Sequence, residues 1–162
     1  MKKYTLAAAA VATLFVGSAS AVEVNLSGNI QEVCEASATQ TSLSDMSTTT
    51  MSGFSFVCND RDGATVTITS AEGGLQGIDS EDLVIPYVAT LSVGGFGDLI
   101  LDLTTGGNTG TNDASQSRDF TGAQLLNGAA ATLEINFGAL TTGTGAWAGA
   151  YYDQLTIQIS AI

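Results

Sequence analysis

Apolar and polar residues alternate strictly near the end of the chain, and this two-residue period is the feature that most restricts the fold. The apolar positions are Leu155, Ile157 and Ile159, and the polar ones are Thr156, Gln158 and Ser160. Successive side chains of a β-strand point to opposite faces, so this period is typical of a strand with one buried face. No segment after residue 21 has the 3.6-residue apolar stripe of an amphipathic helix. The pattern therefore predicts an all-β protein.

Shorter apolar or alternating runs recur along the rest of the chain. The expected strands cover residues 22–33, 54–58, 64–69, 83–93 (with a break), 99–103, 120–126 and 131–137. The Asx/Gly loop at 59–63 predicts a hairpin between the strands on its two sides. Pro86 cannot donate a ladder hydrogen bond, so an edge or a bulge is expected there. Residues 104–117 are expected to form a surface loop. Roughly seven strands at this spacing indicate a two-sheet β-sandwich.

Residues 1–21 have the three-part layout of a secretory signal peptide. The positive charges of Lys2 and Lys3 precede an apolar run over residues 6–16, and small residues lead to an A-x-A arrangement that ends at Ala21. This run is too short for the roughly 20 residues that span a bilayer. We therefore expect cleavage after Ala21 and secretion through the periplasm.

Cleavage would leave one acidic domain at residues 22–162. That segment keeps two cations, Arg61 and Arg118, against all 16 carboxylates, a net charge of −14, and it contains neither lysine nor histidine. Such a surface repels phosphate groups, so we expect no nucleic-acid partner. Binding to anionic lipid is equally disfavoured, and no membrane insertion is expected.

Cys34 and Cys58 are the only cysteines. In an exported protein, an even pair of cysteines most simply forms a disulfide. A metal site is the rival interpretation, but two thiolates without any histidine are a poor ligand set. The sequence predicts one disulfide, no metal site and no cofactor.

Three stretches of the chain together resemble one protein family. The first is Cys34 near the start of the secreted chain, with Cys58 closing the second expected strand. The second is T-S-A-E-G-G-L at residues 69–75, followed by I-P-Y at 85–87. The third is residues 147–159, similar to a Gly-x-Tyr-x-Asp-x-Leu-x-Val terminal strand that begins at Gly149. The combination resembles chaperone–usher pilins, especially the archaic branch that includes spore-coat-U-like domains.

The resemblance implies an immunoglobulin-like, pilin-type β-sandwich that lacks its final strand. A periplasmic chaperone would lend the missing strand, and at an outer-membrane usher another copy or a related pilin subunit would replace it. The donor strand would present Val22, Val24, Leu26 and Ile30. The groove and terminal strand would include Gly149, Tyr151, Leu155, Ile157 and Ile159. The implied function is that of a structural subunit of a fibre or coat at the surface of a Gram-negative-type bacterium.

An enzymatic function has little support in the sequence. Without histidine or a free thiol, Ser-His and Cys-His nucleophiles cannot be assembled. Paired carboxylates hydrolyse glycosides in other proteins, and Glu72 or the cluster at Asp79, Glu81 and Asp82 offers such groups. These carboxylates are better interpreted as solvated loop residues. We therefore expect no enzyme.

Two short stretches of the sequence are compatible with binding functions. Asp60 and Asp62, followed by Gly63, are similar to the start of a calcium loop, but the other ligands do not follow at the required spacing. A plain turn is expected there. Trp147 with the tyrosines at 151–152 could stack on sugar rings. The alternative function is thus a secreted carbohydrate-binding or adhesin β-sandwich domain that does not polymerise.

Overall fold

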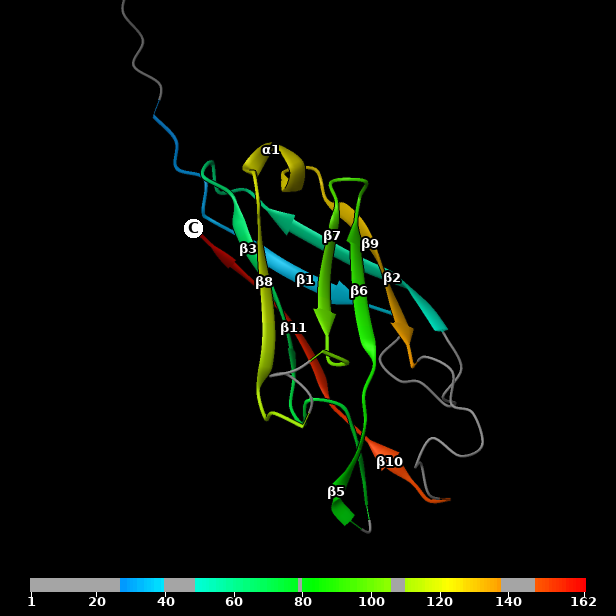
Figure 1. The fold of residues 1–162 in the computed structure, drawn as a ribbon. Helices are drawn as coiled ribbons and strands as arrows, with labels where there is room; N and C mark the ends of the chain where they lie inside the picture. The colour runs from blue at the N-terminus through cyan, green and yellow to red at the C-terminus, as the bar shows by residue number, and fades with distance from the viewer. Residues whose placement is uncertain (1–26, 40–48, 79, 106–109, 138–147) are drawn as a thin grey trace, which may run out of the picture. The chain divides into compact units, whose positions relative to one another are not determined.

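The computed structural model describes residues 27–39, 49–78, 80–105, 110–137 and 148–162 (Figure 1). The chain divides into two compact units, residues 1–30 and residues 31–162. In the first unit the described residues 27–30 form neither helix nor strand. The second unit is built from antiparallel sheets, which confirms the all-β prediction. Across these described ranges, no helix is long and apolar enough to cross a membrane.

The larger sheet has five antiparallel strands in the order β1-β2-β9-β6-β7. Their bounds are β1 Cys34–Ala38, β2 Thr49–Cys58, β9 Ala129–Asn136, β6 Val88–Val93 and β7 Asp98–Asp102. Buried and exposed residues alternate along β9 without a break. The sheet therefore has one face in the core and one in solvent, as expected for an antiparallel sheet.

Two smaller sheets are connected to each other by the chain. One has the order β11-β3-β8, with β11 Leu155–Ala161, β3 Ala64–Ser70 and β8 Ala114–Phe120. The other has the order β10-β4-β5, with β10 Tyr151–Tyr152, β4 Leu75–Gly77 and β5 Ser80–Ile85. The chain passes from β3 to β4, and later returns from β10 to β11.

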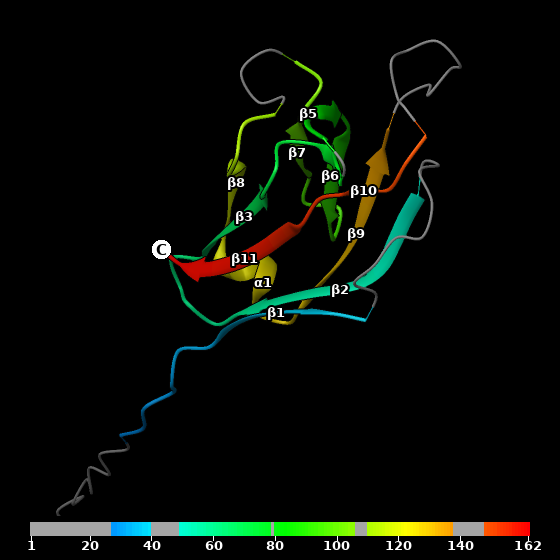
Figure 2. The ribbon, with the colours of Figure 1, turned by 90° about the horizontal axis from the view of Figure 1, so that it is seen from below.

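The five-stranded sheet and the β11-β3-β8 sheet share one apolar core. Phe56 and Leu91 from the first sheet and Val66 and Ile68 from the second are fully buried in the same cluster. In Figure 2, β8, β3 and β11 lie on one side and β9, β6 and β7 on the other. Burial of such side chains away from water is the main favourable contribution to folding.

The hairpin expected around residues 59–63 is wrong. β2 and β3 lie in different sheets and are not paired. Gly63 has φ +110°, and a Cβ there would meet the carbonyl oxygen of Phe120 at 2.1 Å. The chain thus passes close against the end of β8, and β3 begins by pairing with that strand. Both β2 and β3 bury alternate residues in one core, so they face each other across it.

The strand expected at residues 120–126 is also wrong. The chain instead forms a helical turn, α1, at Gly122–Leu125, started by a capping box in which the Thr121 amide donates to the Gln124 side chain at 2.8 Å. The expected loop at 104–117 contains most of β8. Only the two ends of β8, Ala114 and Phe120, are buried, so its sequence lacks the alternation that reveals a half-buried strand.

Other expected strands differ in their bounds. The part of the expected 22–33 strand that is described, residues 27–33, has no strand, and β1 begins only at Cys34. The expected 83–93 strand is divided at residues 86–87 into β5 and β6, which belong to different sheets. The break expected at Pro86 is therefore found.

Candidate functional site

The terminal strand β11 is paired along one edge. All seven of its residues pair with β3, from Leu155 opposite Ser70 to Ala161 opposite Ala64. Within the described part of the chain, no strand pairs with its other edge. β11 is therefore an edge strand.

The backbone hydrogen bonds show which groups of β11 face the open edge. The Ala71 amide donates to the Gln154 carbonyl at 3.0 Å, and the Ile162 amide donates to the Gly63 carbonyl at 3.3 Å. Hydrogen-bonded positions alternate in an antiparallel pair, so the even-numbered residues of β11 face β3. The N–H and C=O groups of Leu155, Ile157 and Ile159 consequently face the open edge.

The same three residues point their side chains to the core. Leu155, Ile157 and Ile159 pack against the buried cluster but are only partly buried themselves. Val66 and Ile68, their inward-facing neighbours on β3, are fully buried. The apolar row of β11 is thus covered on one side only.

The edge strand β1 lies beside β11 and runs in the opposite direction (Figures 1 and 2). The Asn59 amide donates to Val33 at 3.1 Å, and the Thr39 amide donates to Gly53 at 3.2 Å. By the same alternation, the odd-numbered residues of β1 face β2. We call the outward backbone edges of the two strands the open-edge site. Its residues are Cys34, Ala36 and Ala38 of β1 and Leu155, Ile157 and Ile159 of β11.

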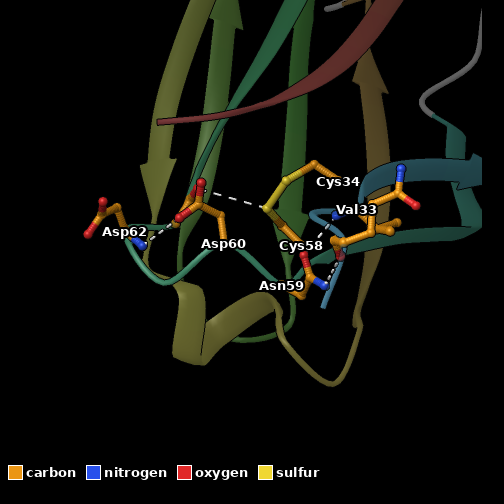
Figure 3. The surroundings of a disulfide bond; sticks show 8 residues. Val33, Cys34, Cys58, Asn59, Asp60 and Asp62 are labelled. Atoms are coloured by element: carbon orange, nitrogen blue, oxygen red, sulfur yellow. Dashed lines mark hydrogen bonds between the residues drawn. A yellow bond between two sulfur atoms is a disulfide. The ribbon is translucent and has the colours of Figure 1, made fainter. Parts of the chain in front are cut away.

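A disulfide joins Cys34 to Cys58 and fixes β1 at the open-edge site (Figure 3). This confirms the predicted pairing. The two cysteines are register partners, the first residue of β1 and the last of β2. The Asn59 side chain adds to this connection, because its Oδ1 accepts from the Val33 amide at 2.7 Å and its Nδ2 donates to the Gln31 carbonyl at 2.8 Å.

A carboxylate holds the other strand of the site at its start. The Oδ2 atom of Asp153 accepts from the Ser70 hydroxyl at 2.6 Å and from the Tyr87 hydroxyl at 2.5 Å. Its Oδ1 atom accepts from the amides of Glu72 at 3.1 Å and Gln154 at 2.7 Å. We call these groups the Asp153 network. It connects β11 to the end of β3 and to the segment between β5 and β6.

The network lies partly inside the core. Ser70 is fully buried, and Tyr87 is 2% exposed. Burial raises the pKa of the Tyr87 hydroxyl far above its ordinary value, and the hydrogen bond and negative charge of Asp153 raise it further. The Tyr87 ring also packs edge-on against Phe137, with ring centroids 5.7 Å apart. The hydroxyl therefore remains a neutral hydrogen-bond donor.

The Asp153 network was not predicted as a site. Its members belong to the stretches 69–75, 85–87 and 147–159, which the structure brings together. Of these members, only Glu72 is a candidate from the sequence, and its part in the network is played by its backbone amide and not by its carboxylate. A local signal did exist. Each of Ser70, Tyr87 and Asp153 stands beside or within an apolar segment, where an uncompensated polar group would be costly.

The remaining predicted site residues are placed as follows. Val22, Val24 and Leu26 lie outside the described residues, and Ile30 is 87% exposed. Gly149 is exposed, and a Cβ there would meet nothing within 4 Å. Tyr151 belongs to β10, where it pairs with Gly77.

The residues of the calcium and carbohydrate hypotheses do not form a binding site in the described part of the chain. The Asp62 amide donates to the Asp60 side chain at 2.8 Å, as in an Asx turn. No group of three metal-ligating side chains occurs among the residues with described positions. Trp147 and Asp79 lie outside those residues. Tyr152 is half exposed, and its hydroxyl donates to the Gln76 side chain at 3.2 Å.

The fold and site define the chain as an all-β protein with one disulfide and an open strand edge. No family model, curated protein or solved structure matches it.

Proposed function

We propose that this protein is a secreted structural subunit of a bacterial surface fibre or coat, which assembles when one subunit donates a strand to the next. The fold would be an immunoglobulin-like, pilin-type sandwich without its final strand. The observation that supports this most directly is the state of β11. Its apolar row is partly exposed, and the backbone groups of the same residues face an unpaired edge beside β1.

An added strand would pair the backbone groups of the open-edge site and would also cover its apolar side chains. Unpaired backbone N–H and C=O groups at a sheet edge are a template for another chain. Alternate side chains of the same incoming strand would cover the apolar row of β11. Main-chain bonds would then supply affinity and side-chain pockets would supply specificity, as in other β-strand additions.

The donor in this proposal is the segment 22–30 of another copy or of a related subunit. It alternates Val22, Val24 and Leu26 with polar residues, so one of its faces is apolar. A site on one surface that receives a segment from elsewhere makes a head-to-tail contact, and such contacts propagate as filaments when the rotation does not close. A periplasmic chaperone would occupy the site first, and an outer-membrane usher would exchange the strands.

Deletion of residues 22–30 tests the proposal. The shortened chain should still bind the chaperone but should form no fibres when it is co-expressed with chaperone and usher, as judged by electron microscopy and sedimentation. A matched pair refines the test. Val24→Asp places a charge on the apolar face of the donor, whereas Asn25→Asp places it on the other face. We expect the first variant to abolish assembly and the second to preserve it.

Two results would contradict the proposal. Normal fibres from the deleted chain would exclude residues 22–30 as the donor. A full chain that stays a stable, protease-resistant monomer without any chaperone would instead favour the non-polymerising carbohydrate-binding domain.

A further inference from the structure

Three crossings of the chain between sheets meet at Asp153. Asp153 follows β10 and precedes β11, where the chain enters the β11-β3-β8 sheet. Ser70 is the last residue of β3, where the chain leaves that sheet for β4. Tyr87 lies between β5 and β6, where the chain enters the five-stranded sheet. One carboxylate bonds to the side chains at both other crossings.

The apolar pattern of β11 does not by itself fix its register against β3. A shift by one residue would turn Leu155, Ile157 and Ile159 to solvent, which burial opposes. A shift by two residues keeps the same faces, and in the middle of the row it exchanges only leucine and isoleucine side chains of similar size. At one end it brings Asp153 or Ala161 into the row, so burial opposes the shift only there. Among the residues that the structure describes, β11 has a partner on one edge only, so no second ladder there opposes such a shift.

We propose that Asp153 is the positioning residue that fixes the register of β11. Its hydrogen bonds connect to atoms at a single place on β3 and on the following loop, namely Ser70 Oγ and the Glu72 amide, and to the Tyr87 hydroxyl. Ser70 is itself held, because its Oγ accepts from the Gly73 amide at 2.8 Å. A two-residue shift would move Asp153 away from all three donors and leave the buried Ser70 and Tyr87 hydroxyls to find other partners.

The consequence for assembly rests on the proposed function. The register of β11 decides which backbone groups and which side chains stand opposite β1 at the open-edge site. A shifted β11 would present the same alternation displaced along the strand. The side chains of a donor would then no longer lie opposite the pockets of the open-edge site. Asp153 would therefore control specificity without touching the donor.

Cysteine pairs on the solvent faces of β3 and β11 report the register directly. Thr67 is the register partner of Gln158, and Thr156 and Ser160 lie two residues to either side. Partners of a hydrogen-bonded pair have Cα atoms about 5.5 Å apart, within reach of a disulfide, whereas diagonal neighbours are at about 7–8 Å and exceed it. Thr67→Cys with Gln158→Cys should therefore crosslink only in the native register. Thr67→Cys with Thr156→Cys or Ser160→Cys should crosslink only after a shift.

The three pairs are compared by peptide mapping under non-reducing conditions in the full exported chain. In the otherwise unchanged protein we expect only the native pair to crosslink. Asp153→Ala should make at least one shifted pair crosslink to a similar extent, and Asp153→Asn, which keeps the shape and one acceptor oxygen, should largely restore the native pattern. Should Asp153→Ala fail to fold, Tyr87→Phe combined with Ser70→Ala removes the two hydroxyl donors instead, and a shifted pair should then crosslink partially.

Leu125→Ala is the control for general loosening. Leu125 is fully buried in α1, which lies at the opposite end of the strands from the β10–β11 junction (Figure 1). The melting temperature of the Leu125→Ala variant should fall by as much as that of Asp153→Ala, yet only the native cysteine pair should crosslink in it. Shifted crosslinks in Leu125→Ala, or native crosslinks alone in Asp153→Ala, would overturn the inference.

The outcomes for register and for assembly are separable. A chain that never assembles but shifts register in Asp153→Ala would refute the proposed function and keep the role of Asp153. A chain that assembles and keeps the native register in Asp153→Ala would refute that role and keep the function.

Discussion

The Tyr87 hydroxyl donates a hydrogen bond to the Asp153 carboxylate across 66 positions of the sequence. Tyr87 stands between β5 and β6, and Asp153 stands just before the terminal strand. Their contact connects the start of β11 to the segment from which the five-stranded sheet receives β6. Because the tyrosine is buried and the acceptor is a carboxylate, this bond belongs to the stronger class of protein hydrogen bonds.

Loss of this bond should measurably destabilise the fold. We expect Tyr87→Phe to lower the free energy of unfolding by about 1.5–3 kcal/mol, the range for hydrogen bonds to charged groups. Tyr152→Phe is the matched control, since its exposed hydroxyl bonds to the neutral Gln76 side chain, and its effect should stay within about 0.5 kcal/mol. Urea denaturation of both variants decides the matter. Equal losses of unfolding free energy would show that the bond to Asp153 stabilises the fold no more than an exposed neutral hydrogen bond does.

Stability should fall in alkaline solution because the pKa of Tyr87 is raised in the folded state. Below the unfolded pKa of about 10, both states hold the proton. Above it only the unfolded state releases the proton, so stability decreases by about 1.4 kcal/mol per pH unit. Urea denaturation between about pH 9 and 11 should show this decrease in the wild type, and Tyr87→Phe should lose that one-proton contribution. If the free energy of unfolding of both proteins fell in parallel with pH, Tyr87 would not be the group whose raised pKa causes the decrease.

Removal of the disulfide should release β1 from the open-edge site. The double variant Cys34→Ala, Cys58→Ala is expected to lose about 3 kcal/mol of stability, because the unfolded chain is no longer constrained. Amide exchange in residues 34–38 should accelerate more than in β9. If exchange instead rises uniformly, the bond stabilises the whole unit and does not hold β1 in particular.

A charge on the inward face of β11 should affect assembly differently from a charge on its outward face. Ile157→Glu would place a charge in the partly buried row of the open-edge site, whereas Gln158→Glu would place it on the exposed face. We expect the first to prevent strand addition and the second to permit it, with fibre yield as the measurement. Equal yields would argue against β11 as the acceptor strand.

The glycine at the turn into β3 should be hard to replace. Gly63→Ala would bring a methyl group onto the Phe120 carbonyl, in addition to the backbone strain of φ +110°. Gly95→Ala is the control, since its φ is +77° but a Cβ there meets nothing within 4 Å. The control should lose about 1–2 kcal/mol from strain alone. Thermal unfolding should show a clearly larger loss for Gly63→Ala, and similar losses would contradict the close approach.

Some of the structure could be predicted from local sequence because the information is local. The alternation of Leu155, Ile157 and Ile159 predicts a strand with one apolar face, and β11 is found there. Two cysteines after a segment that is expected to be a signal peptide predict one disulfide, which is also found. The polar strand β8 was missed because its exposed middle residues carry no period of two.

Pairing was decided only by the tertiary structure. An alternating pattern states which face of a strand is buried, but it does not state which strand lies at each edge. For this reason residues 54–58 and 64–69, which look like the arms of a hairpin, belong to different sheets. The donors to Asp153 from Ser70 and Glu72 are 83 and 81 positions away. Such partners are brought together only by packing of the whole unit. The alternation alone thus predicted the apolar face of the terminal strand. The fold determined its open edge and its connection to the Asp153 network.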